Sequence, residues 1–462
     1  MNAESASPAE PAASSGVLIL SVSGARGIVG AGLTPDIATR LAAAFGQRVG
    51  PGRIIVGRDT RPSGEMILHA VAAGLIGVGC EVLDLGVATT PTVQVVVEDE
   101  KAAGGIVITA SHNPIEWNAL KFVAPNGSFL EKEASAELQR SYHAGELRWQ
   151  RDGFRRLLAR TDADDVHLAR VLSLPYLHKD RIAARGFEVV VDCVNGAGCR
   201  IAPRLLSALG CRVSVVHGSP DGRFPRGPEP VAKNLRDLCQ AVRQSGAHAG
   251  FALDPDGDRL ALVAAGGSPL GEELTLALAA DLVLSRTPGP VVANASTSRV
   301  IEDVAARHGA VVHRAPVGEA NVVSKMRETG AVIGGEGNGG VILPAAHYGR
   351  DALVGMALVL ELLAERQADL ADIAGALPSY VIDKVEVRGV TVDLEALRGA
   401  LQGVFAGATI DQSDGLKFIW QDAWVHVRRS GTEPLVRIIA ESRDARRTIE
   451  LIQTVQTRVS KP

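Results

Sequence analysis

Three aspartates, Asp254, Asp256 and Asp258, alternate along one short stretch of this chain. In an extended loop, alternate residues point to the same side, so the three carboxylates converge. Two carboxylates 4 Å apart repel by about 4 kcal/mol at an effective dielectric constant of 20, so the cluster calls for a cation. Oxygen ligands favour Mg²⁺ or a similar hard ion, although Mg²⁺ usually takes fewer protein carboxylates. An EF-hand is excluded, because Arg259 and Ala265 hold its glycine and glutamate positions. A solvated acidic turn is the alternative.

A serine with a possible chemical role, Ser111, follows the apolar run at residues 105–108. Pro114 has no N–H group and disfavours helix at the residue before it. We therefore expect Ser111 on a tight loop at the carboxyl end of a strand, where ligands bind in open α/β sheets. His112 could orient this loop, and Lys121 follows closely enough to reach back. The alternative is a serine that caps a turn, beside a histidine satisfied by the backbone.

Two further segments carry binding groups. The glycine-rich segment 335–340 contains Glu336, whose carboxylate can accept hydrogen bonds from sugar hydroxyls. Its glycines would let the backbone approach a ligand. The segment 428–432 offers two guanidinium groups, two hydroxyls and a flexible backbone for a phosphate. Each segment alone is also explained by an ordinary turn, but the four together describe one phosphoryl-transfer site.

The elements that must position these groups repeat three times along the chain. A buried strand, a polar loop, a helix closed by glycine and a second strand begin at residues 54, 188 and 291. This order is a βαβ signature. It predicts the α/β class, with three related βαβ-type domains whose mostly parallel sheets are covered by helices.

The end of the chain has a different pattern. Alternating runs at 381–387 and 423–428 predict strands, and residues 444–458 predict an amphipathic helix, so this part reads as a smaller C-terminal α+β domain. Residues 1–15 are small, polar and proline-containing, which predicts a disordered tail. The predicted domains are 16–160 with Ser111, 161–264 with the aspartates, 265–377 with Glu336, and 378–462 with the basic loop.

Composition excludes several classes of function. The net charge of −4 leaves no basic footprint for nucleic acid, so small anions must be held by local clusters. No apolar run is long enough to span a membrane, and the first residues lack the pattern of a secretory signal. The five cysteines are odd in number and form no C-x-x-C pair, which predicts reduced thiols and a cytoplasmic location.

From Val17 onward, the chain resembles the α-D-phosphohexomutase family. The strongest carriers of this resemblance are Thr109-Ala110-Ser111-His112-Asn113-Pro114, Asp254-Pro255-Asp256-Gly257-Asp258-Arg259 and Arg429-Ser430-Gly431-Thr432-Glu433-Pro434. The resemblance implies four domains around a central cleft and a phosphoryl group carried by Ser111. It implies one Mg²⁺ ion, bound by Asp254, Asp256, Asp258 and an oxygen of that phosphoserine. A hexose bisphosphate would serve as activator and intermediate.

The resemblance also assigns the other site residues. The implied catalytic residues besides Ser111 are Arg26, Lys121, His112 and Arg259. The implied substrate-binding residues are Glu336, Asn338, Arg428, Ser430, Gly431 and Thr432. Lys121 would handle the proton of the sugar hydroxyl, which requires a pKa tuned toward neutrality.

The chain departs from the family pattern where Asn338 and Gly340 replace the usual serine and histidine of the sugar loop, and where Ala119 replaces a glycine. The variant loop, with Pro316-Val317-Gly318-Glu319, resembles a phosphoglucosamine mutase branch found in archaea and some bacteria. We therefore expect an isomerase that converts glucosamine 6-phosphate to glucosamine 1-phosphate, a step toward an amino-sugar nucleotide. Phosphomannomutase/phosphoglucomutase activity is the alternative; a non-catalytic sugar-phosphate sensor and a phosphohydrolase are further ones. Monomer and homodimer both remain open.

Overall fold

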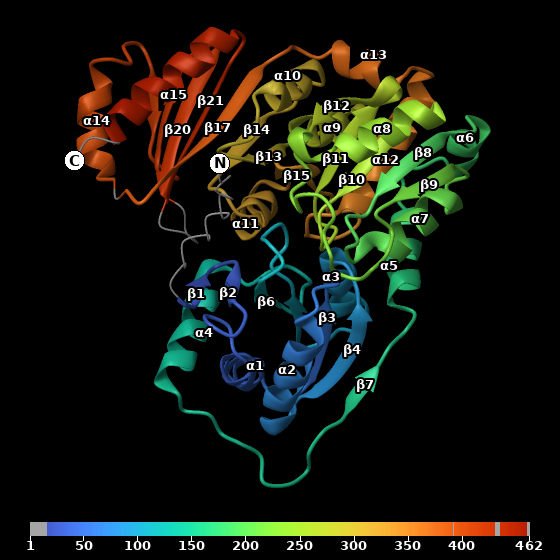
Figure 1. Ribbon diagram of the computed structural model, residues 1–462, viewed down its shortest axis with the longest axis vertical. Helices are drawn as coiled ribbons and strands as arrows, with labels where there is room; N and C mark the ends of the chain where they lie inside the picture. Colours follow the sequence, from blue (N-terminus) through green and yellow to red (C-terminus); the bar gives the residue numbers. More distant parts are fainter. Residues whose placement is uncertain (1–15, 391, 430–434, 460–462) are drawn as a thin grey trace, which may run out of the picture.

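The computed structural model describes residues 16–390, 392–429 and 435–459, which form four units, each built on its own sheet. Three units are α/β and the fourth is a smaller α+β unit, so the predicted fold class is confirmed. In Figure 1 the first unit lies at the bottom in blue and teal, and the fourth lies at the upper left in red. The second and third units lie above the first. The tail predicted at 1–15 falls outside the described residues.

The first unit has a seven-stranded sheet in the order β1-β2-β6-β5-β3-β4-β7. Its strands are β1 Ile19–Ser21, β2 Gly24–Ile28, β3 Arg53–Arg58, β4 Glu81–Val87, β5 Gly104–Ile108, β6 Trp117–Val123 and β7 Leu157–Ala159. Its helices are α1 Pro35–Val49, α2 Gly64–Gly77, α3 Thr90–Asp99 and α4 Lys132–Ala144.

The second unit has a five-stranded sheet in the order β12-β11-β10-β8-β9. Its strands are β8 Glu188–Asp192, β9 Arg212–Val216, β10 Ala249–Leu253, β11 Leu260–Ala264 and β12 Ser268–Gly271. Its helices are α5 Ala163–Leu172, α6 Lys179–Ala184, α7 Gly198–Ala208 and α8 Arg236–Ser245, with short 3₁₀ turns η1 Ala232–Asn234 and η2 Ala265–Gly267. Strand β12 lies beyond the predicted boundary at 264 and still pairs with β11. The domain boundaries themselves stay predictions.

The third unit has a four-stranded sheet in the order β14-β13-β15-β16, and the fourth has an antiparallel sheet in the order β17-β21-β20-β19-β18. The elements of the third are β13 Val291–Asn294, β14 Val312–Ala315, β15 Ile333–Glu336, β16 Gly340–Ile342, α9 Glu273–Arg286, α10 Val300–Arg307, α11 Glu319–Thr329, α12 Ala352–Arg366 and α13 Leu370–Gly375. Those of the fourth are β17 Val381–Arg388, β18 Thr409–Asp411, β19 Leu416–Ile419, β20 Ala423–Arg429, β21 Leu435–Ser442, α14 Leu394–Gln402 and α15 Ala445–Val459.

Each α/β unit combines parallel strands with an antiparallel hairpin. The predicted βαβ repeats form the parallel part of each sheet. The antiparallel pairs β5–β6, β10–β11 and β15–β16 adjoin that part, and the βαβ pattern did not reveal them. The turns of these three hairpins hold Ser111, the three aspartates and the Glu336 loop. Equivalent hairpins of three related sheets therefore present the chemically distinct loops.

The second and third units share one hydrophobic core, whereas the first and fourth have cores of their own. Helix α12 is apolar on nearly every side and packs against α5, α6 and α7 as well as α9. A helix that is apolar all round must be buried on all sides, which explains its central place. No helix of the described part of the chain is long and apolar enough to cross a membrane.

Polar contacts join the fourth unit to the third. Lys384 donates to Glu273 at 2.8 Å, and the backbone N–H of Val317 donates to Asp414 at 2.9 Å. The ring of His426 lies 3.1 Å from the hydroxyl of Ser296. These contacts hold strands β17 and β20 of the fourth unit against the third unit.

Candidate active site

A cavity of about 1530 Å³ lies where the four units meet. It is lined by Arg26, Ser111, His112 and Lys121 of the first unit, Arg259 of the second, Glu336, Asn338 and Arg350 of the third, and Arg428 of the fourth. Described residues from each of the four segments that the sequence singled out therefore line or adjoin one space, and the resemblance implied such a central cleft.

Ser111 is held in an unusual conformation by a buried ion pair. Its φ of 48° is left-handed, which is uncommon for a residue other than glycine. The guanidinium of Arg61 donates to the carbonyl oxygens of Ser111 and Asn113, both at 2.7 Å. Arg61 is paired with Asp59 at 3.0 Å, and both are buried. Buried charges persist only when paired and hydrogen-bonded, so this pair fixes the loop.

Sequence reasoning missed Asp59 and Arg61. Asp59 also accepts a hydrogen bond from the hydroxyl of Thr109 at 2.6 Å. That hydroxyl in turn accepts a hydrogen bond from the N–H of Ser111 at 2.9 Å. The available signal was the charged run Arg58-Asp59-Thr60-Arg61, which directly follows the buried strand at 54–57, since charged residues are rarely buried without a partner.

The hydroxyl of Ser111 points at the aspartate cluster. It donates to Asp254 Oδ2 at 2.7 Å, and His112 Nδ1 lies 3.4 Å from the same hydroxyl. Burial, with the nearby charges of Arg259 and Arg26, holds the pKa of His112 well below its usual value. His112 is therefore neutral at physiological pH.

The three aspartates converge and are fully buried. Their candidate ligand oxygens all lie within 4.8 Å of one another. Asp254 Oδ1 accepts the N–H groups of Asp258 and Arg259, both at 3.1 Å, which curls the loop around it. Asp256 Oδ1 and Asp258 Oδ1 are buried without a hydrogen-bond partner among the described residues. Buried carboxylate oxygens without partners fit a cation, and an oxygen-only set fits a hard one such as Mg²⁺.

Lys121 forms an ion pair with this cluster. Its ammonium group donates to Asp256 Oδ2 at 2.7 Å and lies 3.8 Å from Asp258 Oδ2. Burial acts to lower the pKa of Lys121, but Asp256 and Asp258 outweigh it, so the pKa is raised. The expected role of Lys121, which is to take the proton of the sugar hydroxyl, requires the opposite shift, a pKa lowered toward neutrality. A cation on the aspartates would weaken their attraction for Lys121 and leave burial to lower its pKa.

Arg350 is a second cation that sequence reasoning missed. It lies 3.0 Å from Glu319 and also contacts Asp258 and Glu336. The pKa of Glu336 is about 2, because Arg350 and a hydrogen bond from Asn294 outweigh the effect of burial. Glu336 is therefore ionised, and Arg350 links the loop of Glu336 to the loop of the three aspartates.

Gly340, which replaces the histidine that the resemblance implies, leaves room for Arg350. A Cβ atom at position 340 would lie 2.3 Å from the side-chain stem of Arg350. The space that a side chain at 340 would need is thus filled by Arg350. Asn338, the other replacement, donates to Glu336 at 3.3 Å. Ala119 lies within β6, in register with Arg26 of β2, so a regular strand carries the chain to Lys121.

Three further predicted residues, Arg26, Arg259 and Arg428, line the same cavity. Arg26 donates to the side chain of Asn113 at 2.8 Å, and Arg259 donates to Glu229 at 3.1 Å. Arg428 lies 3.5 Å from Asp414 at the edge of the fourth unit. Ser430, Gly431 and Thr432, predicted to bind phosphate, lie outside the described residues.

Comparison with known proteins gives consistent matches along the chain. The profiles for phosphoglucomutase/phosphomannomutase alpha/beta/alpha domains I, II and III match residues 18–149, 165–267 and 271–380. The profile for the phosphoglucomutase/phosphomannomutase C-terminal domain matches residues 365–456. All four unit types are thus represented, in the same order.

Individual proteins match over nearly their whole length. A phosphoglucomutase/phosphomannomutase of Thermococcus kodakarensis is 38% identical over 442 residues, which cover 93% of this chain and 96% of that protein. A probable phosphoglucosamine mutase of Methanopyrus kandleri is 37% identical, over 93% of this chain and 95% of that protein. The crystal structure of a phosphoglucomutase/phosphomannomutase family protein from Burkholderia thailandensis superimposes with a TM-score of 0.83, at 29% identity and 96% coverage of both chains.

Proposed function

Because this chain belongs to the phosphoglucomutase/phosphomannomutase family, the α-D-phosphohexomutases, it is a phosphosugar mutase, and we propose that it interconverts glucosamine 6-phosphate and glucosamine 1-phosphate. One observation carries the mutase mechanism. The hydroxyl of Ser111 contacts the buried aspartate cluster at the wall of a cavity that also exposes a sugar-binding carboxylate. A reacting hydroxyl, a cation site and a sugar site thus adjoin one another.

The choice of glucosamine rests on the sugar loop. Its sequence, Gly335-Glu336-Gly337-Asn338-Gly339-Gly340, has Gly340 where the resemblance implies a histidine, and Gly340 leaves room for Arg350 to pair with Glu336. The Methanopyrus relative, a probable phosphoglucosamine mutase, supports this assignment. Phosphomannomutase/phosphoglucomutase activity is the second candidate, because the Thermococcus relative at 38% identity carries that name.

In the proposed reaction, phosphorylated Ser111 is the donor. The bond between Ser111 Oγ and phosphorus breaks while a sugar hydroxyl oxygen forms its bond to the same phosphorus, and Lys121 takes the hydroxyl proton. The resulting hexose bisphosphate turns over in the cavity. Its other phosphoryl group then returns to Ser111 Oγ, and Lys121 gives the proton back to the oxygen that is released. A free hexose bisphosphate would prime unmodified Ser111 by the same transfer.

The other residues bind and orient the reactants. Asp254, Asp256, Asp258 and an oxygen of the phosphoserine would hold one Mg²⁺ ion, which would neutralise charge on the transferring group. Arg61 keeps Ser111 in place through its carbonyl oxygen. Glu336 accepts hydrogen bonds from sugar hydroxyls, and Arg26 and Arg259 lie where they add positive charge beside Ser111.

A coupled assay with the 6-phosphates of glucosamine, glucose and mannose tests the proposal. We expect the highest kcat/KM with glucosamine 6-phosphate and no net release of inorganic phosphate. A higher kcat/KM with glucose or mannose phosphate would favour the second candidate. Release of phosphate would indicate a hydrolase, and binding without turnover of all three sugars would indicate a sensor. A cytoplasmic location and the choice between monomer and homodimer stay predictions.

Replacing Arg428 by alanine should lower kcat/KM about ten- to hundredfold, since a charge-assisted hydrogen bond is worth roughly 1.5–3 kcal/mol and each 1.4 kcal/mol is tenfold. Arg428 lines the cavity and would hold the phosphate that is not reacting. The neighbouring Arg429 instead donates to the carbonyl oxygen of Val392 at 3.0 Å. Arg429→Ala is therefore the matched control. Equal kinetics in the two variants would show that Arg428 binds no phosphate.

A further inference from the structure

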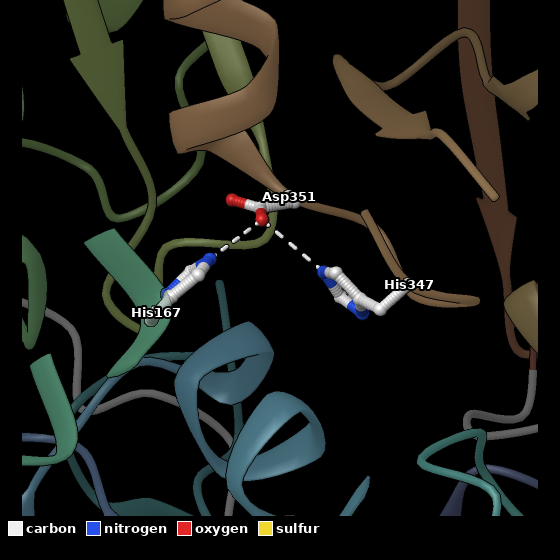
Figure 2. Close-up of side chains that lie close together, drawn as sticks. All are labelled: His167, His347 and Asp351. Carbon is white, nitrogen blue, oxygen red and sulfur yellow. Dashed lines mark hydrogen bonds and ion pairs between the residues drawn. The ribbon is translucent and has the colours of Figure 1, made fainter. Parts of the chain in front are cut away.

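A buried cluster of two histidines and an aspartate lies where the first three units meet. His167 of α5 and His347 of the loop before α12 both point at Asp351, as Figure 2 shows. Their Nε2 atoms lie 2.8 Å and 3.1 Å from the same oxygen, Asp351 Oδ2. All three side chains are at most 2% exposed. No role in the proposed reaction has been assigned to them so far.

The geometry of the cluster fits hydrogen bonds better than a metal ion. Two imidazoles and a carboxylate are ligands that zinc accepts, but structural zinc sites are almost always four-coordinate. The part of the chain that the structure describes supplies three ligand atoms here. Both nitrogen atoms lie at hydrogen-bond distance from a single oxygen. Asp351 Oδ1 is already engaged, because it accepts the N–H groups of Leu353 and Val354 as the N-cap of α12.

These bonds fix the direction of a longer chain of donors. Ionised Asp351 only accepts, so both imidazoles must donate from Nε2. A neutral His167 then accepts at Nδ1 from the hydroxyl of Thr92, 2.9 Å away. Thr92 in turn accepts from Thr89 at 2.7 Å. The hydrogen bonds from Thr89 through Thr92 and His167 to Asp351 thus form one continuous run. His347 joins this run by donating to Asp351 as well.

The residues next to the two ends of this run, Thr90 and Arg350, contact the aspartate cluster. Thr90, the residue after Thr89, donates its hydroxyl to Asp256 Oδ2 at 2.7 Å and its N–H to the Asp256 carbonyl at 2.8 Å. Arg350, the residue before Asp351, contacts Asp258 and Glu336. One network therefore supports two of the three aspartates and the sugar-binding carboxylate.

We propose that His167 and His347 are positioning residues for the cation site. By holding Asp351 between α5 and the start of α12, they fix the positions of Arg350 and of the N-cap of α3. Through these groups they also fix the positions of Asp256 Oδ1 and Asp258 Oδ1, the two oxygens without hydrogen-bond partners among the described residues. The inference rests on the proposed function, in which those oxygens hold Mg²⁺. Replacing a group that orients metal ligands typically lowers metal affinity or activity about 10- to 100-fold.

Matched substitutions of His347 test this role. The amide nitrogen of glutamine reaches about where Nε2 lies, whereas that of asparagine falls short. Nδ1 of His347 has no hydrogen-bond partner among the described residues, so His347→Gln loses little. We expect His347→Asn to raise both the calorimetric Kd for Mg²⁺ and the Mg²⁺ concentration for half-maximal turnover about tenfold, the size found for groups that orient metal ligands. His347→Gln should restore most of this loss. His167→Asn, which removes the other imidazole bond to Asp351 Oδ2, should resemble His347→Asn.

A control separates positioning from general stability. His308 donates to Asp281 at 2.8 Å between α10 and α9, away from the cavity, so His308→Asn removes a similar bond. It should leave Mg²⁺ binding unchanged even where the melting temperature falls. Wild-type Mg²⁺ affinity in His347→Asn would overturn the proposal. A transition metal bound one to one in the wild type and lost in His347→Asn would also overturn it. Wild-type protein that binds Mg²⁺ but turns over no sugar phosphate would instead defeat the proposed function alone.

Discussion

Ser111→Ala should lower turnover by at least about a thousandfold, because loss of a covalent nucleophile removes the reaction path itself. The hydroxyl is the group that contacts Asp254 at 2.7 Å and carries the phosphoryl group in the proposed mechanism. The fold should persist, since Arg61 holds this loop through the carbonyl oxygen of residue 111, which alanine keeps. Ser128, another buried serine of the first unit, provides the matched control; Ser128→Ala should stay active.

The same mechanism predicts a modification of Ser111. Intact mass of the purified wild type should show a population heavier by one phosphate, and peptide mapping should place it on Ser111. Ser111→Ala should lack this population. Full activity of protein unmodified at Ser111, measured without any hexose bisphosphate, would contradict the covalent mechanism.

Removing one carboxylate from the metal loop should have the second largest effect. We expect Asp254→Asn and Asp256→Asn each to lower turnover by at least about a hundredfold, since a bound cation supplies several kcal/mol of charge stabilisation. Their effects on the stability of the metal-free protein should have opposite signs. This difference follows from the surroundings of the two carboxylates.

Burial and the charges of Asp258 and Asp256 hold the pKa of Asp254 well above its usual value. A carboxyl whose pKa is raised by folding binds more protons in the native state, so stability falls as pH rises through that range. Asp254→Asn removes a carboxyl whose ionisation the fold disfavours, so it should raise the melting temperature at pH 7. The pKa of Asp256 is lowered, because Lys121 and hydrogen bonds outweigh burial. Its ionised form stabilises the fold above the unfolded pKa, so Asp256→Asn should lower the melting temperature.

Thermal melts with and without Mg²⁺ measure both effects. Mg²⁺ at a hundred times its Kd should stabilise the wild type by about 2.7 kcal/mol by mass action. Neither variant should show this gain. The metal role would be contradicted if Mg²⁺ left the melting temperature of the wild type unchanged and excess chelator left its activity undiminished.

The sequence predicted the fold class and the four loops because each loop directly follows an apolar strand. Ser111 and the aspartates could be found in this way, since a local pattern places them at strand ends. Arg350 could not, because its partner Asp258 is 92 residues away and belongs to another unit, so only the packing of the units brings the two together. The raised pKa of Lys121 could not be predicted from the sequence for the same reason, because it depends on Asp256, which another unit supplies.

The common core of the second and third units limits how this enzyme can be re-engineered. A designer who wishes to change the sugar preference would naturally exchange the third unit, which carries Glu336, for that of a relative. Helix α12 would then arrive with a surface evolved against a different α5, α6 and α7, and mismatched cores lose stability through both cavities and overpacking. The smallest segment that can be exchanged as one piece is therefore the pair of units from α5 through α13. The fourth unit, with its own core and a polar contact, can be exchanged separately.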